Sequence, residues 1–238
     1  YLLRHKSEIT HLTIYIESHI DGFIHMLPAL ERLEVLDIRA SLDTELYIWT
    51  LPYLSRLRQV CLLGTSVRFP DGMYPNLESL RIISGTVAQI DFPEGHMPRL
   101  DTLSIEAHVL KSTITDLPNT ITRLRFGVTL FPIHVLESIC TLTAIRHLSF
   151  EGCRLTYLPE PFGELETLES LSLRGNFLTM YNSYGERDGV MLPIRGLVNL
   201  QYLDLSGNTC LELGSPSIQL PDNLRVLDVR SLTETMYN

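Results

Sequence analysis

The chain has 238 residues, 45% of them hydrophobic, and carries 28 acidic against 19 basic side chains, for a formal net charge of −9. This is an ordinary globular composition. The negative balance disfavours broad binding to DNA or RNA, which needs a positive field. No apolar run approaches the roughly 18 to 20 residues of a membrane span. We therefore expect neither nucleic acid nor a membrane among the partners.

A short apolar motif recurs along the chain. It is clearest at Ile145–Leu155 (IRHLSFEGCRL) and Leu168–Leu178 (LESLSLRGNFL), which follow LxxLxLxxNxL with Cys153 or Asn176 at the Asn position. The steps between successive copies are 20 to 24 residues, except for one of 32. The first apolar positions of the ten copies are Ile9, Leu33, Leu57, Leu77, Leu100, Ile121, Ile145, Leu168, Leu200 and Leu224.

This pattern resembles the leucine-rich repeat, whose coils each supply one short parallel strand and one return segment. The resemblance spans nearly the whole chain. It implies an α/β fold: a curved horseshoe solenoid of about ten parallel concave strands with short helical or irregular convex segments. Period-two alternation within each apolar core agrees with strands buried on one face. We expect a single domain over residues 1–238 and, since neither end carries a recognisable cap, flanking domains of a larger protein.

Prolines recur in the return segments, directly after an apolar residue. Pairs such as Leu27-Pro28 and Leu158-Pro159 place an apolar anchor beside a residue that ends helices and prevents ladder pairing. The clearest helix is predicted at His134–Thr141. The 32-residue step holds a polar insertion, Thr179–Met191, which predicts a solvated loop. Either it is a tolerated surface insertion or it contacts a partner.

Motifs for chemistry are absent from the sequence. It contains no GxxxxGK[ST], GxGxxG, HExxH, CxxC or GxSxG, and its eight His residues match no metal-ligand spacing. We therefore expect no catalytic activity, no cofactor and no metal. The cysteines stand singly, and there is no N-x-[ST] acceptor, which favours a reducing, intracellular setting. Asn176, Asn208, Cys153 and Thr65 occupy the Asn position, where we expect a structural role.

Candidate binding residues lie on the strands between the core positions. Their side chains point away from the core and form what we call the concave face. Cys61, Leu63 and Ile83 predict an apolar spot there, with arginines close by. Anchors of this kind dominate interface energetics. We therefore predict that a protein partner binds these residues: Cys61, Leu63, Arg81, Ile83, Arg123, Arg125, Tyr202, Asp204 and Asp228.

A competing interpretation of the charged residues is purely structural. In it, Arg125 and Arg174 pair with Glu106 and Glu151 across adjacent strands, where each exposed pair is worth little.

Two stretches suggest a subclass. Phe92–Glu106 (FPEGHMPRLDTLSIE) and Leu197–Asn208 (LVNLQYLDLSGN) resemble the repeat region of plant intracellular nucleotide-binding immune receptors, which implies a protein-recognition module within a sensor or adaptor. Leu117–Gly127 and Leu220–Val229 are similar to the shorter LP-type repeats of bacterial effectors and some amoebal proteins. The alternatives are a substrate-recognition arm of a ubiquitin-ligase adaptor or effector, and a purely structural scaffold.

Overall fold

The computed structural model describes residues 4–16, 21–40, 48–64, 66–68, 74–85, 87–88, 97–110, 117–130, 133–179, 192–211 and 218–232. Thr65 and residues 180–191 of the predicted insertion lie outside these ranges. The chain divides into two compact units, Tyr1–Ile121 and Thr122–Asn238, and each is described by itself. None of the helices in the described ranges is both long and apolar enough to cross a bilayer.

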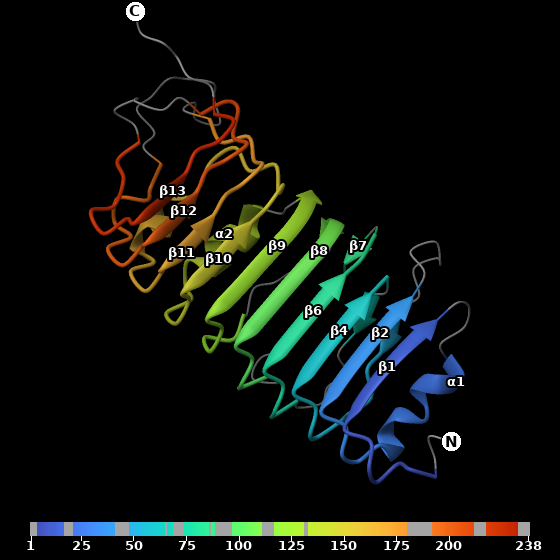
Figure 1. Cartoon of the computed structure of the whole chain (residues 1–238). Helices are drawn as coiled ribbons and strands as arrows, with labels where there is room; N and C mark the ends of the chain where they lie inside the picture. The colour runs from blue at the N-terminus through green and yellow to red at the C-terminus, as the bar shows by residue number, and fades with distance from the viewer. Residues whose placement is uncertain are drawn as a thin grey trace, which may run out of the picture. The chain divides into compact units, whose positions relative to one another are not determined.

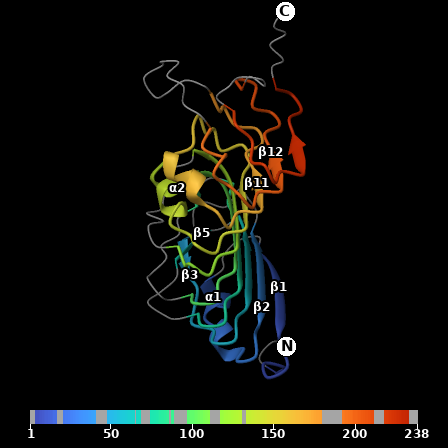
Figure 2. The ribbon, with the colours of Figure 1, turned by 90° about the vertical axis from the view of Figure 1, so that its left-hand side faces the viewer.

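The first unit is built on a sheet of parallel strands (Figure 1). In the described part of this unit the spatial order is β1 (His11–Ile16), β2 (Val35–Ala40), β4 (Gln59–Leu63), β6 (Ser79–Ile83) and β8 (Thr102–Leu110). The short strand β7 (Val87–Ala88) pairs with the far end of β8. Two further strands, β3 (Ile48–Thr50) and β5 (Ser66–Arg68), form a separate parallel pair. Figure 2 shows β3 and β5 on the side of the coils away from β1 and β2.

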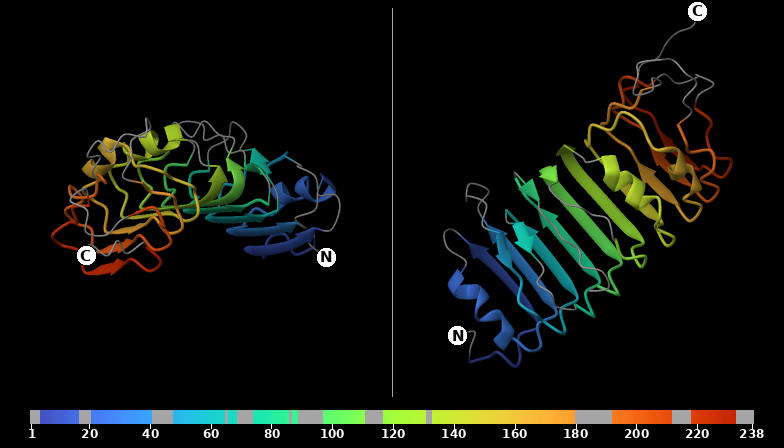
Figure 3. Two further views of the ribbon diagram at one scale, coloured as in Figure 1. Left: turned by 90° about the horizontal axis from the view of Figure 1, so that it is seen from above. Right: turned by 180° about the vertical axis from the view of Figure 1, so that it is seen from behind.

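The second unit repeats this plan. Its described strands are β9 (Arg123–Leu130), β10 (His147–Phe150), β11 (Ser170–Ser172), β12 (Tyr202–Asp204) and β13 (Val226–Asp228), all parallel and in chain order. Helix α2 (Ile133–Ile139) and the 3-10 turn η2 (Glu160–Glu164) lie across the coils from the strands (Figure 3). In the first unit the helical elements of the return segments are α1 (Asp21–Ile24) and the 3-10 turn η1 (Leu27–Ala29) among described residues.

These elements confirm the predicted solenoid. Each of the ten repeat copies contains a strand, and the strands pair in exact register, so that Leu36 lies beside Leu12 and Leu171 beside Leu148. The core side chains of inner coils are fully buried; Leu36 and Leu171, for example, are 0% exposed. The helix predicted at His134–Thr141 is α2. Strands β3, β5 and β7 were not predicted.

Backbone hydrogen bonds tie each coil to the next just before the strands. The carbonyl of Glu34, for example, accepts from the amides of Arg58 at 2.8 Å and Gln59 at 3.0 Å. One oxygen thus satisfies two successive donors of the following coil. The same double acceptance occurs at Thr10, Glu34, Arg58, Glu78, Thr122, Arg146, Glu169 and Gln201.

The Asn position supplies a second tie, in a buried row. Asn208 is 0% exposed; its Nδ2 donates to the carbonyls of Leu173 and Leu205, both at 2.8 Å, and its Oδ1 accepts from the amide of Leu178 at 3.3 Å. Asn176 bonds its own neighbours in the same way. The predicted structural role of both is confirmed.

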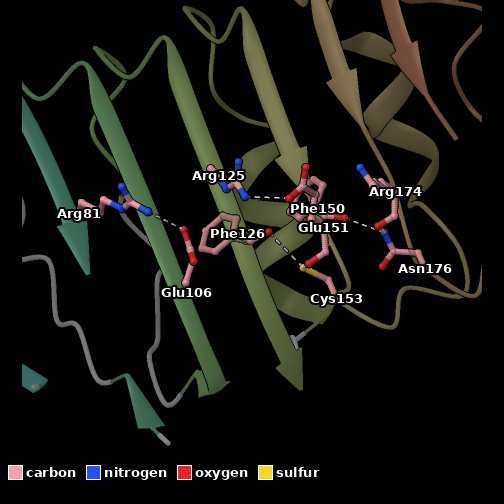
Figure 4. Close-up of polar contacts among 9 residues, drawn as sticks. All are labelled: Arg81, Glu106, Arg125, Phe126, Phe150, Glu151, Cys153, Arg174 and Asn176. Carbon is pink, nitrogen blue, oxygen red and sulfur yellow. Dashed lines mark hydrogen bonds and ion pairs between the residues drawn. The ribbon is translucent and has the colours of Figure 1, made fainter. Parts of the chain in front are cut away.

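Cys153 fills the Asn position with a thiol. Its Sγ donates to the carbonyl of Phe126 at 3.4 Å, as Figure 4 shows, but a thiol offers only a weak donor and a weak acceptor. The side chain is 2% exposed, and burial raises the pKa of the thiol to about 11. The predicted weak substitution for Asn agrees with this geometry.

A third row of side-chain bonds was not predicted. Asn76, Asn199 and Asn223 each directly precede the first core leucine of a coil. Each donates from Nδ2 to a carbonyl of the preceding coil at 2.6 to 2.8 Å. These hydrogen bonds are exposed to solvent, so they compete with water more than those of Asn208 do.

We expect Asn208→Ala to lower the free energy of unfolding by about 2–4 kcal/mol, because it strands the Leu178 amide and Leu173 carbonyl in the core. Asn223→Ala, which removes one exposed bond to Val198, is the matched control and should cost less than about 1 kcal/mol. Urea denaturation of both variants measures the difference. Equal losses would contradict the assigned role of the buried row.

The cysteines should differ in reactivity, because the thiolate is the nucleophile. Burial raises the pKa of Cys140 and of Cys153 to about 11, whereas Cys210 is exposed. At pH 8 we expect iodoacetamide to alkylate Cys210 first, and Cys140 and Cys153 only after unfolding. Peptide mapping by mass spectrometry reads this directly. Labelling of Cys153 at the Cys210 rate in the folded protein would show that its coil opens.

Candidate functional site: the concave face

On the first unit, strand register assembles the concave face in straight rows. One row runs Tyr15, Arg39, Leu63, Ile83 and Glu106 across successive strands. The row beside it contains Asp37, Cys61 and Arg81. The structure therefore brings the predicted residues Cys61, Leu63, Arg81 and Ile83 together on β4 and β6, with the three apolar side chains partly exposed.

Ion pairs stand on both sides of this apolar centre. On one side Arg39 donates to Asp37 Oδ2 from Nε at 3.0 Å and from Nη2 at 2.8 Å. The Arg39 guanidinium also lies 5.6 Å from the centre of the Tyr15 ring, which is within cation–π range. On the other side Arg81 Nη2 donates to Glu106 Oε1 at 3.2 Å (Figure 4). The charges at both edges are thus already neutralised within the chain.

Tyr15, Asp37 and Arg39 were not among the predicted site residues. Tyr15 is 71% exposed, more than any other large hydrophobic side chain among the described residues. A signal was present in the sequence, because VLDIR at Val35–Arg39 recurs as VLDVR at Val226–Arg230. In both copies the arginine folds back onto the aspartate two positions before it.

On the second unit the predicted arginines and acids lie along one face. The central row runs Arg125, Ser149, Ser172, Asp204 and Asp228 from β9 to β13. Arg123 lies opposite His147 in the row before it, and Tyr202 lies opposite Val226. Arg81 belongs to the first unit, so the structure places it in a different group from Arg123 and Arg125.

The competing structural interpretation is half correct. Arg125 Nη2 donates to Glu151 Oε2 at 2.7 Å, as that interpretation expects (Figure 4). Glu106, however, pairs with Arg81, and Arg174 makes no ion pair within the described residues. The expected pairing of Arg174 is therefore wrong. The side chains in both Arg–Glu pairs are about a third to a half exposed, so each pair contributes at most about 1 kcal/mol.

The acids near the end of the second unit have different surroundings. Asp228 accepts from Arg230 Nε at 2.9 and 3.1 Å, and these hydrogen bonds lower the pKa of its carboxyl group. Asp204 is only 5% exposed, and its Oδ1 accepts from the amide of Ser206 at 2.9 Å. Tyr202, on the same face, is 37% exposed, and burial followed by the charges of Asp204 and Asp228 raises its pKa.

Elsewhere the described residues offer little for small-molecule chemistry. They contain no group of three or more His, Cys, Asp or Glu side chains that could hold a metal ion. A hollow of about 190 Å³ lies between Pro28–Leu33 and Tyr53–Arg56 of neighbouring coils, smaller than the few hundred cubic ångströms typical of ligand pockets.

The leucine-rich-repeat family model and the TLR13 structure agree with this architecture. The family model for the leucine-rich repeat matches residues 199–220. No curated protein matches the chain. The crystal structure of a TLR13–ssRNA13 complex is 19% identical over 97% of this chain and 37% of that one, with a TM-score of 0.56. The functional domain of InlJ from Listeria monocytogenes is 14% identical over 100% of this chain and 57% of that domain, with a TM-score of 0.48.

The chain thus spans just over a third of the TLR13 structure and just over half of the InlJ domain. Together, the repeated motif, the parallel coils in register, the buried Asn row and the family model that matches residues 199–220 identify the fold as a leucine-rich-repeat solenoid.

Proposed function

We propose that the chain is a non-catalytic recognition module whose concave face binds a protein partner. The observation that carries this is the centre of the first unit, where partly exposed Cys61, Leu63 and Ile83 lie between the Arg39–Asp37 and Arg81–Glu106 pairs. Interfaces concentrate their binding energy in a few central anchors surrounded by groups that exclude water. This patch has that layout.

The paired charges matter to the energetics of binding. An unpaired charge must be neutralised by the partner or be desolvated at a cost. Because the flanking charges neutralise each other, a partner need supply only an apolar or aromatic side chain against Leu63 and Ile83. The exposed Tyr15 ring, stacked on Arg39, extends the surface with an aromatic group of the kind enriched at interfaces.

The second unit contributes the remaining predicted residues to this proposal. Arg123, Arg125, Tyr202, Asp204 and Asp228 lie on its concave face and form the second contact region. The wider role we propose is a sensor or adaptor such as an immune receptor, on the resemblance of Leu197–Asn208 to receptor repeats. A ubiquitin-ligase recognition arm or a structural scaffold would use the same face with a different neighbour in the assembly.

RNA is the ligand class that competes with protein, because the TLR13 structure is a complex with single-stranded RNA. The net charge of −9 argues against it here, since RNA binding rests on unneutralised arginine or lysine. Arg81 and Arg125 both already pair with glutamates. The face also lacks a run of stacked aromatic side chains among its described residues, which single-strand binders use.

Leu63→Ser combined with Ile83→Ser should weaken the affinity for the protein partner at least about tenfold, because the double substitution removes the apolar anchors. The partner is first identified by cross-linking the wild-type chain in native lysate, and its affinity is then measured by calorimetry. Val198→Ser is the control, since Val198 is 50% exposed but precedes the strand region. Unchanged affinity in the double variant, with an unchanged melting temperature, would rule out this patch.

Arg123→Glu with Arg125→Glu tests the second contact region. The change places a carboxylate where Arg125 now meets Glu151, so we expect weaker partner binding with a loss of stability below about 1 kcal/mol. The same calorimetry, repeated with a single-stranded RNA in place of the partner, separates the two ligand classes. Tight RNA binding by the wild type that the double variant loses would replace protein with RNA as the ligand.

A further inference from the structure

Asp204 stands apart from the other acids of the concave face. Asp37 pairs with Arg39, Glu106 with Arg81, Glu151 with Arg125, and Asp228 with Arg230. Asp204 makes no ion pair within the described part of the chain, although its charge and that of Arg230, which pairs with Asp228, interact at longer range. It is also far more buried than an unpaired carboxylate normally is, at 5% exposure.

The equivalent aspartates of two other coils each pair with an arginine that the Asp204 coil lacks. Asp228 occupies the same place in the next coil, beside Asp204 in register, and Asp37 occupies it near the start of the first unit. In both, the residue two positions later is an arginine that binds the carboxylate. In the Asp204 coil that residue is Ser206. The site therefore keeps the acid and lacks the cation that its two equivalents contain.

Two serine hydroxyls beside Asp204 are also left without partners. Ser206 is 6% exposed, its amide bonds Asp204 Oδ1, and its own Oγ is enclosed with no hydrogen-bond partner. Ser172 lies opposite Asp204 in register on β11, and its Oγ is likewise enclosed and unpartnered, as is that of Ser149 opposite Ser172 on β10. Ser172 and Ser206 are the two of these serines next to Asp204 in register or sequence. Asp204 Oδ2 also has no hydrogen bond but is not among the enclosed atoms, so it reaches solvent. Buried polar groups in folded proteins are nearly always paired.

We propose that Asp204, flanked by Ser172 and Ser206, receives the ammonium group of a lysine side chain from the protein partner. This inference rests on the proposed function, because it uses the same concave face as a protein-binding surface. An ammonium group is compact and has three donors, which suits one carboxylate oxygen that reaches solvent and two neighbouring hydroxyls. A guanidinium is planar and wider. Tyr202, two residues earlier on the same face, offers its ring to the aliphatic stem of the lysine.

Arg174 is the intramolecular competitor. Its side chain is exposed and has no ion pair among described residues, yet it lies close enough to Asp228 for its charge to help lower the pKa of that carboxyl group. If Arg174 were the resident partner of Asp204 in solution, removing either residue would destabilise the fold. If a partner lysine is the intended cation, removing Arg174 should instead strengthen lysine binding.

The test is an NMR titration of the isotope-labelled chain with N-acetyl-lysine methylamide as the probe, following the Ser206 amide, which bonds Asp204 Oδ1. We expect a saturable shift in the wild type and a loss of affinity of about tenfold or more in Asp204→Asn. Asparagine keeps the acceptor for the Ser206 amide and removes only the charge. Asp37→Asn, at the equivalent but occupied position, is the matched control and should bind the probe normally.

Three results would overturn the proposal: equal binding by Asp204→Asn, equal binding of N-acetyl-arginine methylamide, or a lower melting temperature in both Asp204→Asn and Arg174→Gln. An unchanged or higher melting temperature in Asp204→Asn supports it, because an unpaired buried charge has been removed. The probe contains no apolar anchor, so it does not test the Leu63–Ile83 patch. If the Leu63→Ser, Ile83→Ser double variant loses partner binding but the wild-type chain does not bind the lysine probe, only the present inference fails and the proposed function stands.

Discussion

The structure depends on the way one coil is bonded to the next. At eight positions just before strands, one carbonyl oxygen accepts two successive amides of the following coil, and the strands then pair without any shift of register. In parallel strands a slip by one residue would turn every core leucine toward solvent. The double acceptance and the buried Asn176–Asn208 row oppose such a slip, so each residue has a defined neighbour one coil away.

Fixed register turns short sequence motifs into surface rows. It places Arg58 beside Glu78, Arg81 beside Glu106, Arg125 beside Glu151, and Arg146 beside Glu169, always with the arginine one coil earlier. Each exposed pair adds little stability. Their effect on recognition is larger, because they neutralise the concave face locally in a chain whose net charge is −9. What remains distinctive on that face is the apolar patch of the first unit and the unpaired Asp204 of the second.

A repeat protein also carries its own internal comparisons. The copies VLDIR, VLDVR and YLDLS place an aspartate at one position in three coils, and only the third lacks the arginine that follows it. In two coils an arginine pairs with the carboxylate, although Asp37 Oδ1 is itself enclosed without a hydrogen bond, and in the third the carboxylate has no arginine two positions later. The backbone plan is the same in all three coils, so the difference lies in the side chains. Selective loss of an internal partner is the pattern expected where an external one binds.

The sequence by itself determined the solenoid, its ten strands and the structural role of Asn176 and Asn208. Each coil must bury apolar side chains at the same core positions, so the regular spacing of leucines predicts where the coils and strands lie. It also placed Leu63 and Ile83 on one face. The folded structure adds that Glu106 pairs with Arg81 and not Arg174, that Asn76 bonds back to Ser55, that β3 and β5 pair, and that Asp204 has no ion pair among the described residues. These depend on return segments of unequal length and on side-chain rotamers between coils, which residue spacing along one chain does not specify.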